Sequence, residues 1–213
     1  MRILIAGHSF VRRFREYLIT FNGLPRYYLW WQFLNFAPWI GLPFEDIFIC
    51  GNSGQKADWL GLLAVRRSVD LFTPDILLIE LGTNDLAQQL PCYFSDNICS
   101  AAVAGNIIHL CDDLYLSGKV DFFVIYLVVQ RRKLRGDLTR TCFDRRRKHF
   151  NHCIRELAKT RPYVLPYKHD RTILVNLKPY DTSNDDIHVT SCQGLRLYNF
   201  SIRKAVLMSL ARV

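Results

Sequence analysis

The feature that most constrains the fold is a short apolar run near the start and the turn that ends it. Ile3-Leu4-Ile5-Ala6 is apolar at every position, which is typical of a strand covered on both faces in a parallel sheet. The run stops at Gly7, and apolar residues then recur at helical spacing over 10–18. The sequence therefore predicts that Ser9 lies where a central strand ends and a helix begins. Open α/β sheets bind ligands at such points.

The same alternation of apolar runs and helical patterns continues along the 213 residues. Further strands are expected at Asp46–Cys50, Asp75–Leu81, Val120–Val129 and Arg171–Leu177. Helices are expected at about 56–69, 95–116, 142–159 and 193–210. Strands that alternate with helices predict a doubly wound parallel sheet. We therefore expect one domain over residues 1–213, a three-layer α/β/α sandwich with a flavodoxin-like sheet of about five parallel strands.

Composition limits the class of protein. Half of the residues are hydrophobic and 22% are charged, as in a globular chain. No apolar run reaches the length of a membrane span or a signal peptide, and the seven cysteines are scattered without a CxxC pair. We therefore expect an intracellular protein with reduced cysteines. No cofactor is expected, because the chain has no Gly-x-Gly-x-x-Gly motif, no Walker lysine and no fourth ligand beside His149, His152 and Cys153.

Polar residues follow the expected strands, each just past the point where a strand ends. They are Ser9, Gly54, Asn84 and the pair Asp185 and His188. Because the carboxyl ends of parallel strands meet at one edge of a sheet, we expect these residues to converge there. A serine needs an imidazole to take its proton, and the imidazole needs a carboxylate to orient it. Ser9, His188 and Asp185 therefore have the residue types of an acyl-transfer triad, and their spacing lets Asp185 reach the His188 ring.

The same set supplies donors for an oxyanion. These are the backbone N–H of Ser9, the backbone N–H of Gly54 and the carboxamide of Asn84. The alternative role for Ser9 is that of a helix N-cap, a position where serine is common.

Four short blocks resemble the SGNH hydrolases, the GDSL-like esterase and lipase superfamily, over nearly the whole chain. Residues 7–9 (Gly-His-Ser) are similar to the first block, usually Gly-Asp-Ser, which implies that Ser9 is the nucleophile. Gly54 is similar to the glycine of the second block, with Gly51 as the less favoured register. Residues 82–85 (Gly-Thr-Asn-Asp) match the third block and imply that Asn84 lies in the oxyanion hole. The pair Asp185 and His188 matches the last block.

The resemblance implies a serine esterase. We expect it to hydrolyse a small, acetyl-like ester through an acyl-enzyme intermediate. His8 stands where the family often has aspartate. Residues 7–13 (Gly-His-Ser-Phe-Val-Arg-Arg) and the later Gly-Thr-Asn-Asp-Leu resemble the SGNH-type esterase domains associated with animal non-LTR retrotransposons. That narrower resemblance implies a first-open-reading-frame protein with nucleic-acid-binding parts.

The net charge of +9 is concentrated in two basic clusters. Their members are Arg131, Arg132, Lys133 and Arg135 in one, and Arg145, Arg146, Arg147 and Lys148 in the other. Such clusters suit RNA or an anionic membrane surface, and the alternative is a solvated loop and helix face. The second functional hypothesis is therefore a binding module that holds RNA, lipid or protein with little or no catalysis. The oligomeric state is left open.

An aromatic segment at 25–44 separates the first helix from the second strand. It holds three of the four tryptophans, Trp30, Trp31 and Trp39. The favoured interpretation is an extra packed helix that covers the sheet edge, and the alternative is a lid or an apolar acyl pocket. A third hypothesis, a lipid-directed esterase, has these tryptophans contact a membrane surface.

Overall fold

The computed structural model describes residues 1–21, 37–42, 46–88, 96–131, 134, 138–169 and 192–212. Its sheet has five strands, which are β1 (Arg2–Gly7), β2 (Asp46–Gly51), β3 (Ile76–Glu80), β4 (Phe122–Tyr126) and β5 (Val164–Tyr167). The strands lie in the order β2-β1-β3-β4-β5, and every neighbouring pair is parallel. This is the flavodoxin-like order, so the predicted fold class is confirmed.

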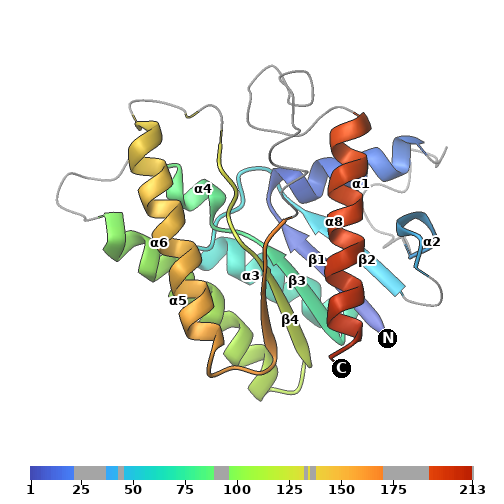
Figure 1. Cartoon of the computed structure of the whole chain (residues 1–213). Helices are drawn as coiled ribbons and strands as arrows, with labels where there is room; N and C mark the ends of the chain where they lie inside the picture. The colour runs from blue at the N-terminus through green and yellow to red at the C-terminus, as the bar shows by residue number, and fades with distance from the viewer. Residues whose placement is uncertain are drawn as a thin grey trace.

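Helices cover both faces of the sheet (Figure 1). One layer contains α1 (Ser9–Phe21), the short α2 (Ala37–Ile40) and α8 (Cys192–Leu210). The other contains α3 (Trp59–Phe72), α5 (Asp96–Leu116) and α6 (Arg140–Ala158). A four-residue helix, α4 (Thr83–Leu86), follows β3 directly.

The strands send alternate side chains into two hydrophobic cores. In β1, Leu4 and Ala6 pack toward α3, α5 and α6, whereas Ile3 and Ile5 pack toward α1 and α8. All five residues of β3 and of β4 are buried. This two-sided burial is why these strands are apolar at nearly every position.

The fifth strand differs from the sequence prediction. The structure places it at Val164–Tyr167, before the expected Arg171–Leu177, which lies outside the described residues. The aromatic segment 25–44 also lies largely outside them, with 37–42 as its described part.

Two further findings bear on composition. Among the described residues, Cys50, Cys99, Cys111, Cys142 and Cys153 are free thiols. Within the same part of the chain, every helix is too short or too polar to cross a membrane.

Candidate active site

The turn after β1 holds Ser9 in the first turn of α1. The His8 carbonyl accepts the first intrahelical bond, from Arg12 N at 3.2 Å, so His8 is the N-cap. The His8 ring performs the capping, because its Nδ1 accepts a hydrogen bond from Phe10 N at 3.3 Å. The N-cap role considered for Ser9 thus belongs to its neighbour. Ser9 is 6% exposed and lies at the positive end of a 13-residue helix, where backbone N–H groups favour a developing anion.

Gly7 and Gly51 allow this turn to pack closely on the sheet. The two residues pair in register at the ends of β1 and β2, and Asn52 N donates to Gly7 O at 3.0 Å. A Cβ on Gly51 would lie 2.2 Å from Arg12 N, so the first turn of α1 rests directly on the end of β2.

The loop after β2 contains Gly54, the predicted second oxyanion donor. Gly54 is exposed, with φ +72°, and a Cβ there would meet no atom within 4 Å. Glycine is therefore required by backbone conformation at this position and not by lack of space. Gly51, the other register, is buried as the last residue of β2, which leaves Gly54 in the turn beyond the strand.

Asn84 lies after β3 and is bonded to the Gly54 loop. Its Nδ2 donates to the Gln55 carbonyl at 2.9 Å, and its Oδ1 accepts from Arg131 Nη2 at 2.8 Å. The turn that carries it depends on Gly82, which has φ +95° and whose Cβ would lie 2.9 Å from the Phe150 ring. Asn84 and the residue after Gly54 are thus in direct contact, so the turns that carry two of the predicted oxyanion donors lie together.

Asp85 makes a second link between the same two loops. Its carboxylate oxygens accept from Ala57 N at 3.0 and 3.1 Å. Burial raises the pKa of Asp85 to about 6, against the lowering effect of these hydrogen bonds. The adjacent Asn84 and Asp85 therefore both hold residues 55–57 in place.

The predicted acid and base of the triad, Asp185 and His188, lie outside the described residues, within 170–191. Their roles stay predictions.

A buried polar cluster, centred on Glu80 at the end of β3, includes His8, the residue before Ser9. His8 Nε2 and His169 Nε2 lie 3.9 and 3.7 Å from Glu80 Oε1, and the Tyr198 hydroxyl donates to Glu80 Oε2. Burial alone would raise the pKa of Glu80, but His169, His8 and Tyr198 together hold it below its usual value. Because His8 Nδ1 accepts from Phe10 N, Nε2 is the ring nitrogen that faces this carboxylate.

This cluster was not predicted from the sequence. The signal that could have revealed it is Glu80 itself, an acidic residue in an otherwise apolar strand. A buried carboxylate needs partners.

The two basic clusters are only partly exposed. Arg131 is 8% exposed and donates a hydrogen bond to Asn84. Arg146 is 6% exposed and donates to Asp96 and to the carbonyls of Leu86 and Gln88. The predicted basic surface therefore loses Arg131 and Arg146, because both guanidiniums are used inside the protein. Arg147 is half-buried on Asp144, whereas Arg145 and Lys148 are exposed. Arg132, Lys133 and Arg135 lie outside the described residues.

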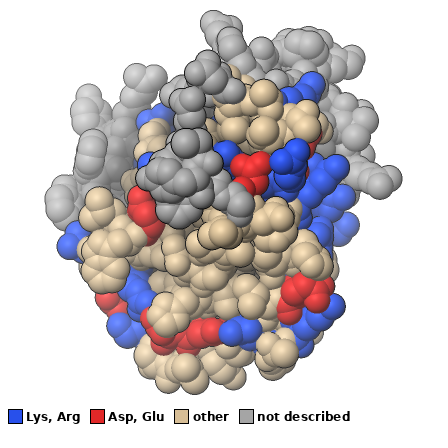
Figure 2. Space-filling view, turned by 90° about the vertical axis from the view of Figure 1, so that its left-hand side faces the viewer, with Lys and Arg blue, Asp and Glu red and all other residues tan. Residues whose placement is uncertain are grey.

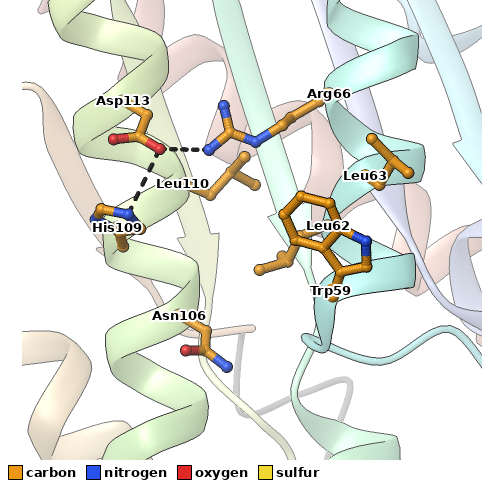
Figure 3. Close-up of a pocket in the computed structure, with 8 residues that line it drawn as sticks. All are labelled: Trp59, Leu62, Leu63, Arg66, Asn106, His109, Leu110 and Asp113. Carbon is orange, nitrogen blue, oxygen red and sulfur yellow. Dashed lines mark hydrogen bonds and ion pairs between the residues drawn. The ribbon is translucent and has the colours of Figure 1, made fainter.

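A separate pocket lies between α3 and α5, away from the predicted site (Figure 3). It has a volume of about 350 Å³ and contains none of the predicted site residues. Trp59 and Asn106 lie toward one end of it, and Arg66 and Asp113 form an ion pair at the other. Its lining comprises Trp59, Leu62, Leu63, Arg66, Asn106, His109, Leu110 and Asp113.

Solved structures that superpose on this chain include GDSL-like lipases and an acetylxylan esterase. A GDSL-like lipase from Bacteroides thetaiotaomicron superposes with a TM-score of 0.64 at 18% identity, over 98% of this chain and 88% of that one. A catalytic mutant of the acetylxylan esterase Axe2 from Geobacillus stearothermophilus gives 0.66 at 13% identity, over 96% and 93%. A member of the lipolytic G-D-S-L family from Veillonella parvula gives 0.63 at 15% identity, over the whole of both chains. Known family models and curated sequences give no match. The chain thus has the SGNH hydrolase fold.

Proposed function

We propose that the protein is a serine esterase of small acyl esters. The observation that carries the proposal is the bond between Asn84 Nδ2 and the Gln55 carbonyl, which joins the third predicted oxyanion donor to the loop of the second. Ser9 lies at the end of the adjacent strand β1, at a helix N-terminus. Both features favour charge stabilisation at one place. The acetylxylan esterase among the structures of this fold supports an acetyl-like acyl group.

In this mechanism the Ser9 hydroxyl oxygen attacks the ester carbonyl carbon while His188 takes the hydroxyl proton. The carbonyl oxygen becomes an oxyanion that accepts hydrogen bonds from Ser9 N, Gly54 N and Asn84 Nδ2. The C–O bond to the leaving alcohol then breaks, and the His188 proton passes to that alcohol. Water attacks the acyl-enzyme by the same route and regenerates Ser9. Asp185 orients the His188 ring throughout.

The test is hydrolysis of p-nitrophenyl esters of increasing acyl length by the wild type and by Ser9→Ala. We expect turnover to be highest for the acetyl ester and to fall by about 10³-fold or more in the variant. Ser53→Ala is the matched control, because Ser53 is exposed in the loop at the same edge and has no proposed role. Equal turnover by the wild type and Ser9→Ala would contradict the proposal.

A second candidate function is RNA binding, which one surface favours. On α6, the side chains of Arg145, His152 and Lys159 are 62%, 66% and 67% exposed, and Lys148 and Arg155 are also exposed. These five residues alternate at spacings of three and four and so form one stripe of about 21 Å along the helix. Figure 2 shows the α5 and α6 side of the molecule, where Lys and Arg gather along the right-hand side with acidic residues between them.

The stripe is tested by the salt dependence of binding to single-stranded RNA. Arg145→Glu with Lys148→Glu is expected to weaken binding and to lower the slope of log K against log salt by roughly 0.7 for each phosphate that the variant no longer neutralises. Arg196→Glu on α8, across the sheet, is the matched control. RNA affinity that is unchanged by the α6 pair contradicts this candidate. Binding to anionic vesicles instead would assign the stripe to membranes.

A further inference from the structure

Arg131 is a buried arginine that contacts the predicted oxyanion hole through one residue. Its Nη2 donates to Asn84 Oδ1 at 2.8 Å, across 47 positions of sequence. The guanidinium also lies over the ring of Phe143, 6.0 Å from its centroid. Phe143 is fully buried in α6, so the arginine has a fixed surface on one side.

The chain segment that carries Arg131 is itself held in place. Residues 127–131 follow the end of β4 and are not part of the strand. Leu127 N donates to Tyr167 O of β5 at 2.8 Å. Asn151 of α6 then brackets Val128: its Oδ1 accepts from Val128 N at 2.8 Å, and its Nδ2 donates to Val128 O at 3.0 Å. Arg131 therefore reaches Asn84 from a segment bonded to both β5 and α6.

The bond to Asn84 constrains the direction of the carboxamide. A guanidinium has donors only, so it can bond the amide oxygen and never the amide nitrogen. With the oxygen held by Arg131 and one N–H donating to the Gln55 carbonyl, the second N–H of Nδ2 has a defined direction. The positive charge on the oxygen side also polarises the amide, which strengthens its N–H groups as donors.

We propose that Arg131 is a positioning residue of the oxyanion hole, which holds the Asn84 carboxamide so that its second N–H meets the developing oxyanion. This inference rests on the proposed esterase function. In this role Arg131 acts through Asn84, whose amide oxygen it holds.

The test is a double-mutant cycle of Arg131→Met and Asn84→Ala on kcat and KM. Loss of one oxyanion donor costs about 10²- to 10³-fold in kcat, so we expect that loss in Asn84→Ala and roughly tenfold in Arg131→Met, with KM nearly unchanged. Because Arg131 acts through Asn84, the double variant should be no slower than Asn84→Ala alone. Losses that multiply in the double variant would overturn the inference.

Two further variants separate positioning from general destabilisation. Arg161→Met removes a guanidinium that is bonded to Asp112 far from the site. Any effect of this variant on kcat should be independent of Asn84, so the fold-losses of Arg161→Met and Asn84→Ala should multiply in the double variant. Arg131→Lys keeps a donor and a charge and should recover part of the lost kcat. It also replaces Arg131→Met in the cycle if that variant does not fold.

A spectroscopic arm decides the inference if the wild type shows no Ser9-dependent turnover, which would be a failure of the proposed function alone. The side-chain amide signals of Asn84 are identified in a ¹⁵N-correlated NMR spectrum by their absence in Asn84→Ala. In the wild type we expect two resolved, slowly exchanging protons. In folded Arg131→Met or Arg131→Lys we expect them to shift and to exchange faster. Signals that both variants leave unchanged would overturn the positioning role.

Discussion

Asp85 occupies a position where burial and hydrogen bonding oppose each other. Its carboxylate accepts two bonds from Ala57 N, yet burial raises its pKa to about 6 from an ordinary value of 3.8. The folded protein therefore holds the Asp85 proton more tightly than the unfolded chain does. The contribution of Asp85 to the free energy of unfolding is therefore fully present below about pH 4. It is lost as the pH rises through 6, and the total loss is up to ~3 kcal/mol.

Asp85→Asn removes this pH dependence while it keeps an acceptor for Ala57 N. We expect the variant to have a higher free energy of unfolding than the wild type at pH 8 and no such advantage at pH 4, measured by urea denaturation. Asp112→Asn is a control of opposite sign, because the Arg161 hydrogen bond lowers the pKa of Asp112. An Asp85→Asn difference that is the same at both pH values would contradict the account.

The burial of Arg131 could not be predicted from the sequence. It begins a run of basic residues after a strand, a pattern that is typical of an exposed loop, and we therefore predicted a surface role for it. Its burial depends on Asn84 and Phe143, partners at distances in sequence that no local pattern records. The placement of Ser9, Gly54 and Asn84 just after strand ends was predictable, because strand ends leave a clear sequence pattern, and their roles stay predictions.

At the scale of elements, the contact between α1 and β2 places Ser9. A Cβ at Gly51 would overlap the Arg12 backbone, which cannot move unless α1 moves. We expect Gly51→Ala to lower the free energy of unfolding by about 3 kcal/mol and to reduce any Ser9-dependent activity. The measurements are denaturant unfolding and labelling of Ser9 by a fluorophosphonate.

Alanine substitutions at two other glycines serve as controls for the stability effect of Gly51→Ala. Gly54→Ala meets no atom and should cost only ~1 kcal/mol, from its positive φ. Gly105→Ala lies within α5 with space around it and should stabilise the protein by ~1 kcal/mol. If Gly51→Ala destabilised the protein no more than Gly54→Ala does, α1 would pack on β2 less closely than the 2.2 Å approach to Arg12 N indicates.

The elements themselves were largely predictable, and β5 explains the exception. The predicted strands at 46–50, 75–81 and 120–129 coincide with β2, β3 and β4 to within a few residues, because largely apolar runs mark the strands of a sheet between two helix layers. β5 is four residues long and contains Pro166, which indicates a turn when the sequence is examined alone. A proline is tolerated there because, among the strands that the structure describes, β5 lies at the edge of the sheet.

At the scale of the whole molecule, the Glu80 cluster joins parts that are distant in sequence. His8 follows β1, Glu80 ends β3, His169 follows β5, and Tyr198 belongs to α8. His169 Nδ1 also lies 2.9 Å from Ser201 Oγ of α8. Helix α8 is therefore bound to the sheet by polar contacts to Glu80 and His169, in addition to its apolar packing.

Because this cluster joins β1, β3, β5 and α8, the pH dependence of Glu80 should affect the stability of the whole fold at acid pH. The pKa of Glu80 lies below its ordinary value of 4.5, so its stabilising contribution is present above pH 4.5 and is lost as the pH falls through the lowered value. Tyr198→Phe removes the only hydroxyl that donates to Glu80 among the described residues, and Glu80→Gln removes the charge itself.

We expect Tyr198→Phe to cost about 1–3 kcal/mol at pH 7, because it leaves a buried carboxylate short of a donor. Its first consequence should be local: amide hydrogen exchange in α8 should quicken more than in α5, which packs on the opposite face. Glu80→Gln should be less stable than the wild type at pH 7 and approach it at pH 3. Tyr115→Phe, which alters a partly exposed tyrosine of α5 stacked on Tyr163, is the control and should leave α8 unchanged. Uniform exchange across both helices in Tyr198→Phe would mean that α8 is held by its apolar face alone and that the polar cluster serves Ser9 rather than the fold.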